Sequence, residues 1–105
     1  MPTADDTIRL EDACAELQKR FENTPHVYFY VGFFAVIGRV EGFDNITIIF
    51  DKGDKTWVCQ TVVLKQNIAQ HGHSPTEALR GMLVRAREHL EVATQSLAGL
   101  MEVVS

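Results

Sequence analysis

The chain has 105 residues, of which 46% are hydrophobic and 23% are charged, and its formal net charge at pH 7 is -4. This is the composition of one globular domain, and a chain of this length buries enough surface to fold without disulfides or a structural metal. The mild acidity argues against a non-specific binder of duplex nucleic acid, because such proteins need a stripe of Lys and Arg against the phosphates. We therefore expect one domain over residues 1–105, with residues 1–6 flexible and with no cofactor.

An amphipathic helix is predicted over residues 7–22. Its apolar side chains recur at spacings of four and three and so share one face: Leu10, Cys14, Leu17 and Phe21. Asp6 or Thr7 can cap its start. Pro25 follows, and because a proline pushes the preceding residue out of the helical region, the helix should end before it.

The next segment is typical of β-structure. Residues 27–40 form a long run of apolar and aromatic residues, which predicts one strand that Gly32 or Gly38 bends or bulges. Turn-forming residues at 41–45 then lead to a second strand over 46–50.

A third strand is predicted over residues 56–64, after a tight turn at 51–54 in which Gly53 supplies a positive φ. These three strands would form an antiparallel meander. Apolar side chains alternate onto both of its faces, so helices on one face would leave the other open. Since monomers seldom expose a large apolar face, we expect a second copy or another protein to cover it.

A long second helix is the clearest element. Ser74 is a capping residue, Pro75 fits the first helical position, and Glu77 can return a bond to the Ser74 amide. Gly99 is a place where the helix could stop or bend. Apolar residues alternate at spacings of four and three, the repeat of a coiled-coil seam: Leu79, Leu83, Ala86, Leu90, Ala93, Leu97, Leu100 and Val104.

The predicted fold class is therefore α+β, a three-stranded antiparallel meander with an N-terminal helix and a long C-terminal helix (α-β-β-β-α). The same order of elements occurs in double-stranded-RNA-binding domains, which place lysines at the start of the second helix to bind phosphates. In this chain the corresponding residues, 74–80, contain no lysine and only one basic residue, Arg80. The apolar run 27–37 is too short to span a membrane, and the N-terminus does not resemble a secretory signal. We expect a cytoplasmic protein that binds neither a membrane nor duplex nucleic acid.

One candidate ligand site is the loop before the second helix. His71 and His73 could hold a metal, or together with Ser74 and Arg80 could bind an anion at the helix start. A structural metal needs about four ligands, and the loop supplies only two, so no metal is assigned. An ordinary polar loop is the favoured interpretation of these residues.

Aromatic residues of the predicted strands form a second candidate surface, made of Tyr28, Tyr30, Phe34 and Trp57. They could stack on the bases of a single-stranded nucleic acid. Packing in a core or at a protein interface explains the same residues without a ligand, and we favour it.

No motif for catalysis is present: the chain lacks a phosphate-binding glycine loop, a nucleophile elbow and a zinc-protease signature. Cys59 beside a histidine would be the only nucleophile worth testing. The arginines of the second helix, Arg80, Arg85 and Arg87, each have a glutamate in helical reach and predict a solvated face of weak ion pairs. We expect no enzyme and no catalytic residue.

The leading hypothesis is a non-enzymatic protein-interaction module, homodimeric through the second helix or the open sheet face, that acts as a small inhibitor, adaptor or chaperone. Domains of this size are often encoded by phages or mobile elements, including anti-defence and antitoxin-like proteins. The alternatives are a small-ligand or metal-binding protein using the histidine loop, and a single-stranded nucleic-acid binder using the sheet aromatics. The residues expected at the dimer or partner interface are Leu83, Leu90, Leu97, Leu100, Tyr28, Tyr30, Phe34 and Trp57.

Overall fold

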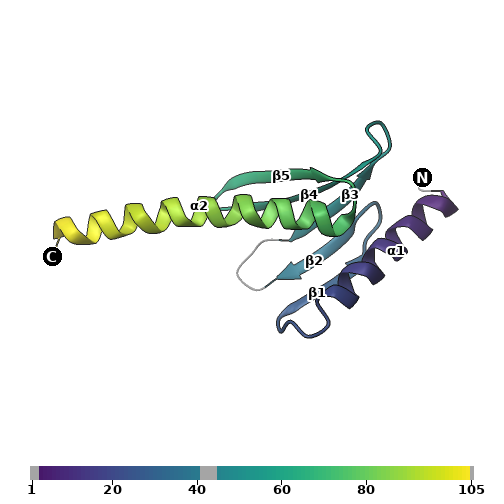
Figure 1. Ribbon diagram of the computed structural model, residues 1–105, viewed down its shortest axis with the longest axis horizontal. Coiled ribbons are helices and arrows are strands. Elements are labelled where there is room, and N and C mark those ends of the chain that lie inside the picture. The colour runs from purple at the N-terminus through teal and green to yellow at the C-terminus, as the bar shows by residue number, and fades with distance from the viewer. Residues whose placement is uncertain (1–2, 41–44, 105) are drawn as a thin grey trace.

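The computed structural model describes residues 3–40 and 45–104 (Figure 1). The elements in chain order are α1 (Ala4–Arg20), β1 (Val27–Val31), β2 (Val36–Val40), β3 (Ile46–Asp51), β4 (Thr56–Val63), β5 (Gln66–Gly72) and α2 (Pro75–Val104). The α+β class is confirmed, but the antiparallel sheet has five strands in the order β1-β2-β3-β4-β5 and not three. Among the described residues, no helix is long and apolar enough to cross a membrane.

The run 27–40 is two strands and not one. The amide of Gly32 donates to the carbonyl of Ala35 at 2.7 Å, which closes a hairpin with Phe33 and Phe34 at its tip. Two phenylalanines at a turn contradict the usual turn chemistry, so the sequence pattern predicted a continuous strand. The turn expected at residues 41–45 lies outside the described residues apart from Asn45.

The fifth strand was missed for a similar reason. Leu64 and Lys65 join β4 to β5 in a two-residue turn with φ of 52° and 67°, a left-handed conformation that normally selects Asn or Gly. In the β3–β4 turn the left-handed residue is Lys55, with φ of 55°, and not Gly53 as predicted. Both turns therefore hold non-glycine residues in the left-handed region, which is costly for residues with a Cβ.

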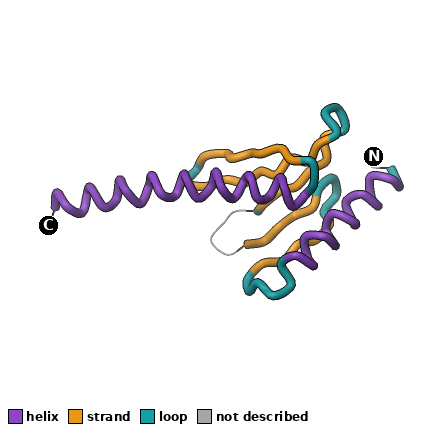
Figure 2. Tube along the Cα trace, viewed as in Figure 1, coloured by secondary structure: helices purple, strands orange, loops and turns teal. Residues whose placement is uncertain are grey.

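Both helices lie on one face of the sheet, α1 over β1 and β2, and α2 over β4 and β5 (Figures 1 and 2). Residues that pair across the strands alternate between this covered face and the open face. The largest fully buried side chains of the resulting core are Leu17, Ile46, Ile48, Met82, Val36 and Cys59.

Helix α1 begins three residues earlier than predicted. Thr3 caps it, since the Thr3 hydroxyl accepts the Asp6 amide and the Asp6 carboxylate accepts the Thr3 amide. Residues 4–6, expected to be flexible, are therefore helical, and only Met1 and Pro2 of that segment lie outside the described residues.

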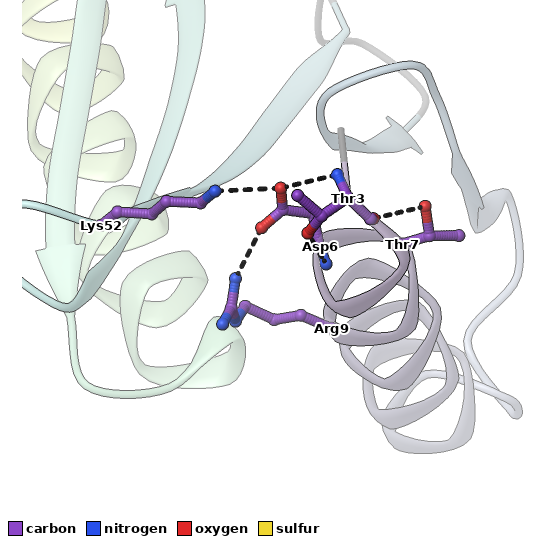
Figure 3. A network of polar contacts seen from close by, with 5 residues as sticks. All are labelled: Thr3, Asp6, Thr7, Arg9 and Lys52. Carbon is purple, nitrogen blue, oxygen red and sulfur yellow. Dashed lines mark hydrogen bonds and ion pairs between the residues drawn. The ribbon is translucent and has the colours of Figure 1, made fainter. Parts of the chain in front are cut away.

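Asp6 also ties α1 to the sheet. Its carboxylate lies 2.9 Å from the Lys52 ammonium in the β3–β4 turn and 3.1 Å from the Arg9 guanidinium (Figure 3). The Arg9 guanidinium itself lies 4.3 Å from the centre of the Phe50 ring. The bond from the Thr3 amide, followed by the contact with Lys52, holds the pKa of Asp6 well below its usual 3.8.

Each edge strand of the sheet accepts one hydrogen bond from a helix side chain. Gln18 of α1 donates to the carbonyl of Phe29 in β1 at 2.6 Å, and Arg85 of α2 donates to the carbonyl of Ala69 in β5 at 2.5 Å. Open edges are templates for pairing with further strands. Each bond occupies one carbonyl of an edge strand and ties that strand to the helix above it.

Two glycines let α2 lie close to β5. A Cβ on Gly72 would meet the backbone of Ala78, and one on Gly81 would lie 2.5 Å from Gln70 Cγ. Gly99, in contrast, has open space around it, and the helix runs through it to Val104 instead of stopping there.

The start of α2 follows the predicted capping with one change. The Ser74 hydroxyl accepts the amide of Glu77 at 3.1 Å, as expected. Glu77 returns its bond to the amide of His73 at 3.1 Å, one residue before the one predicted. The histidine loop is thereby fixed to the helix it precedes.

The Asp6→Asn substitution should make the free energy of unfolding depend less on pH in the acidic range. Because the folded-state pKa is lowered, the ionised carboxylate stabilises the fold above about pH 4–5, and this contribution is lost as pH falls below that range. The difference in unfolding free energy between the native chain and Asp6→Asn should therefore shrink between pH 6 and pH 2, measured by urea denaturation.

Asp5→Asn removes the same charge from the same helical turn without touching the bonds to Lys52 or Arg9 and is the matched control. A difference between the native chain and Asp6→Asn that stays constant over this pH range would show that the carboxylate does not anchor α1.

Candidate functional site

The second half of α2 extends beyond the sheet that covers its first half (Figure 1). Between Leu90 and Val104 no side chain is buried, and Leu97 and Leu100 are 57% and 66% exposed. The radius of gyration is 16.0 Å, whereas a compact chain of this length would have about 13 Å. We call residues 90–104 the overhang.

The overhang continues the face that α2 buries in the core. Met82 and Ala86 are 0% and 1% exposed against the sheet. At 3.6 residues per turn, Ala93, Leu97 and Leu100 lie on the same side of the helix as these two residues. The seam predicted from the sequence is therefore real as a stripe, but the domain covers only its first part.

An apolar groove lies beside the same helix. It has a volume of 480 Å³ and lies between the end of α1 and the first half of α2. Phe21, Leu83 and Val84 contribute apolar surface to its lining. Three cations also line it: Arg20, Arg80 and Arg87.

The expected ion pairs of α2 are only partly present. Arg87 lies 3.8 Å from Glu91, but this pair is largely exposed and so contributes little. Arg85 binds a strand carbonyl instead of Glu88, and Glu77 binds the His73 amide. The sequence did not reveal the groove, because Arg20 and Phe21 are brought to α2 only by the fold.

The four predicted aromatic residues do not form one surface. Trp57 faces the core at 8% exposure, with its ring centre 5.2 Å from that of Phe50, so its assignment to an interface was wrong. Tyr28 and Tyr30 lie on the open face of β1 with their rings stacked at 6.1 Å. Phe34 lies at the tip of the β1–β2 hairpin.

The hairpin tip is itself an exposed apolar feature. Phe33 and Phe34 are 68% and 57% exposed, with ring centres 4.2 Å apart in an edge-on arrangement. Phe33 was not among the predicted site residues. The adjacent Gly32 was the one sequence signal of a turn here.

The histidine loop does not gather the predicted ligands. His71 lies on the open face of β5 with its Nδ1 3.2 Å from the Thr56 hydroxyl, and His73 holds the α2 cap through its amide. Ser74 uses its hydroxyl as the cap, and Arg80 lies apart in the groove. The four residues therefore do not form one anion pocket.

The described residues include one cluster with metal-ligand chemistry, made of Asp51, Asp54 and His71, whose ligand atoms lie within 4.8 Å of one another. Asp51 already accepts the Gly53 amide at 2.9 Å as part of the β3–β4 turn. The cluster lies at the surface, and its geometry is explained by that turn.

Cys59 lies in the core and is fully buried. Burial raises the pKa of its thiol to about 12, so the thiol stays protonated at neutral pH. A protonated and inaccessible thiol is not a nucleophile.

Comparison of the chain with protein-family models, curated proteins and solved structures gives no match.

The native protein should leave Cys59 unlabelled by Ellman's reagent. A Cys14→Ser variant isolates this thiol, and its reaction at pH 8 should be limited by unfolding, becoming stoichiometric only in denaturant. Rapid stoichiometric labelling of the folded variant would contradict both the burial and the raised pKa.

Proposed function

We propose that this protein is a non-enzymatic protein-interaction module that forms a homodimer through α2 and binds another protein as an inhibitor, adaptor or chaperone. We also propose that the protein is cytoplasmic, as predicted from the sequence. An origin in a phage or mobile element, with an anti-defence or antitoxin-like role, is compatible with its size.

The overhang is the observation that carries the proposal. An isolated helix of about 15 residues is marginal in water, and Gly99 costs about 1 kcal/mol more than Ala in its interior. Despite this, the overhang presents Leu90, Leu97 and Leu100 in the register of the buried seam. Such a stripe is stable when a partner covers it, which is the arrangement of helix-mediated protein contacts.

The β1–β2 hairpin is the surface that we assign to the second protein. Tyr28, Tyr30, Phe33 and Phe34 combine exposure with edge-on or stacked ring pairs. Aromatic residues dominate the energetics of protein interfaces because they bury a large area at a small entropy cost. We therefore assign the contact with the second protein to these side chains.

The two alternative functions have less support. A ligand site in the histidine loop would need His71, His73 and Arg80 to converge, and they serve separate contacts. A single-stranded nucleic-acid site would need a longer aromatic platform than Tyr28 and Tyr30, and a basic groove along it. We therefore do not propose either of them.

Replacing Leu97 and Leu100 with Glu should convert the dimer to a monomer. Each Leu contributes about 2 kcal/mol when buried, so losing both raises the dissociation constant by at least about 100-fold. Sedimentation equilibrium over a concentration series measures this change.

The matched control adds the same two charges to the opposite side of the overhang, as Gln95→Glu with Ala98→Glu, and should leave dimerisation within a few-fold of the native chain. A native chain that is monomeric at tens of micromolar would overturn the dimer.

A further inference from the structure

We propose that the groove between the end of α1 and the first half of α2 binds a free single-chain alkyl carboxylate, whose hydrocarbon lies on the apolar floor and whose carboxylate contacts arginines. The groove is the 480 Å³ hollow described above, a volume within the range of about 300–1,000 Å³ that small-molecule sites occupy. Every residue that lines it precedes the overhang, so this site is separate from the proposed dimer contact.

Positive charge gathers in this groove, although the chain as a whole is acidic. The formal net charge is -4 at pH 7, yet three of the ten lysines and arginines line the hollow: Arg20, Arg80 and Arg87. The other lining residues are apolar residues and threonines: Phe21, Thr24, Thr76, Leu79, Leu83 and Val84. Like charges around one hollow repel each other, so an anion between them is favoured over a neutral or cationic ligand.

Two of the three arginines can bind an anion without breaking another contact. Within residues 3–40 and 45–104, Arg20 and Arg80 form no hydrogen bond or ion pair, whereas Arg87 lies 3.8 Å from Glu91. A guanidinium presents its N–H donors in a planar fork that matches the two oxygens of a carboxylate. The carboxylate of the ligand therefore belongs beside Arg20 and Arg80.

The apolar floor is formed by the fold itself and needs no ligand to assemble. Leu79 is 2% exposed, and Phe21 and Leu83 are half-buried against the core. The ring centre of Phe21 lies 5.7 Å from that of Phe29 in β1, which holds this wall of the groove in place. Val84 is 41% exposed, more than the other apolar lining residues, so a hydrocarbon chain buries apolar surface here.

The positions along α2 place both ends of one ligand within reach. Arg80 and Val84 are four residues apart in the helix, so they lie one turn apart on the same face. A carboxylate at Arg80 therefore adjoins the apolar surface at Val84 and Leu83. Because the hydrocarbon enters the hollow together with its head, the geometry favours a free molecule over a lipid that stays in a bilayer.

Isothermal titration with decanoate below its critical micelle concentration tests this site. We expect saturable binding, and octanoate, a shorter homologue, should bind about tenfold more weakly because it buries fewer CH₂ groups. Decanol and decyltrimethylammonium lack the negative charge and should also bind at least about tenfold more weakly. Equal binding of decanol, or binding of anionic phosphatidylglycerol vesicles without binding of free decanoate, would overturn the inference.

Two variants with matched controls locate the contacts. Arg80→Gln removes one guanidinium and should weaken decanoate binding about fivefold, whereas Lys19→Gln removes the same charge beside the groove and should have little effect. Val84→Asp places an anion on the floor and should weaken binding more than about tenfold, whereas Val92→Asp makes the same change on the overhang and should have little effect. Both valines are exposed, so these variants should fold. If each variant and its control bind decanoate alike, the inference is wrong.

The overhang is the competing site for an apolar ligand, and amide chemical shifts distinguish the two sites. Decanoate should shift the amide resonances of residues 20–24 and 79–87, and the variant with Leu97→Glu and Leu100→Glu should bind it as the native chain does. Shifts confined to residues 90–104, together with loss of binding in that variant, would overturn the groove site. A monomeric native chain that binds decanoate in the groove would overturn the proposed dimer and support this inference.

Discussion

The length of α2 is the constraint on which the rest of the structure depends. Its 30 residues extend over about 45 Å, and the sheet beneath it is long enough to cover only the first half. The apolar stripe does not stop where the sheet does, since Ala93, Leu97 and Leu100 continue the face of Met82 and Ala86. The first half of α2 therefore closes the core of the domain, and the second half presents the same apolar stripe outside the domain.

The remainder of the fold is consistent with the association through this helix that we propose. At the two edges of the sheet, Gln18 binds one carbonyl of β1 and Arg85 binds one carbonyl of β5. The Asp6 contacts fix α1 against the β3–β4 turn, and the end of α1 in turn forms one wall of the groove. In the proposed dimer, association through α2 leaves the aromatic β1–β2 hairpin exposed for the second protein.

How far the sequence predicts this structure depends on the element. The helical seam and the Ser74 cap were readable, because periodicity and capping are local signals. The tip at Phe33 and the turn at Leu64 were not, because tertiary packing there overrides turn preferences, and β5 went unnoticed behind that second turn. Of the site, the stripe was predicted. The groove was not, because its lining joins Arg20 of α1 to Arg80 of α2, and no local pattern encodes that both residues line one hollow.

Hydrogen exchange of the overhang amides at two protein concentrations tests the central claim most directly. If a second copy covers residues 90–104, their amides should exchange slowly well above the dissociation constant and at least tenfold faster well below it, while the core amides of β3 and β4 stay unchanged. Overhang amides that exchange at the same rate at both concentrations, in a range where sedimentation shows the dimer dissociating, would contradict the account.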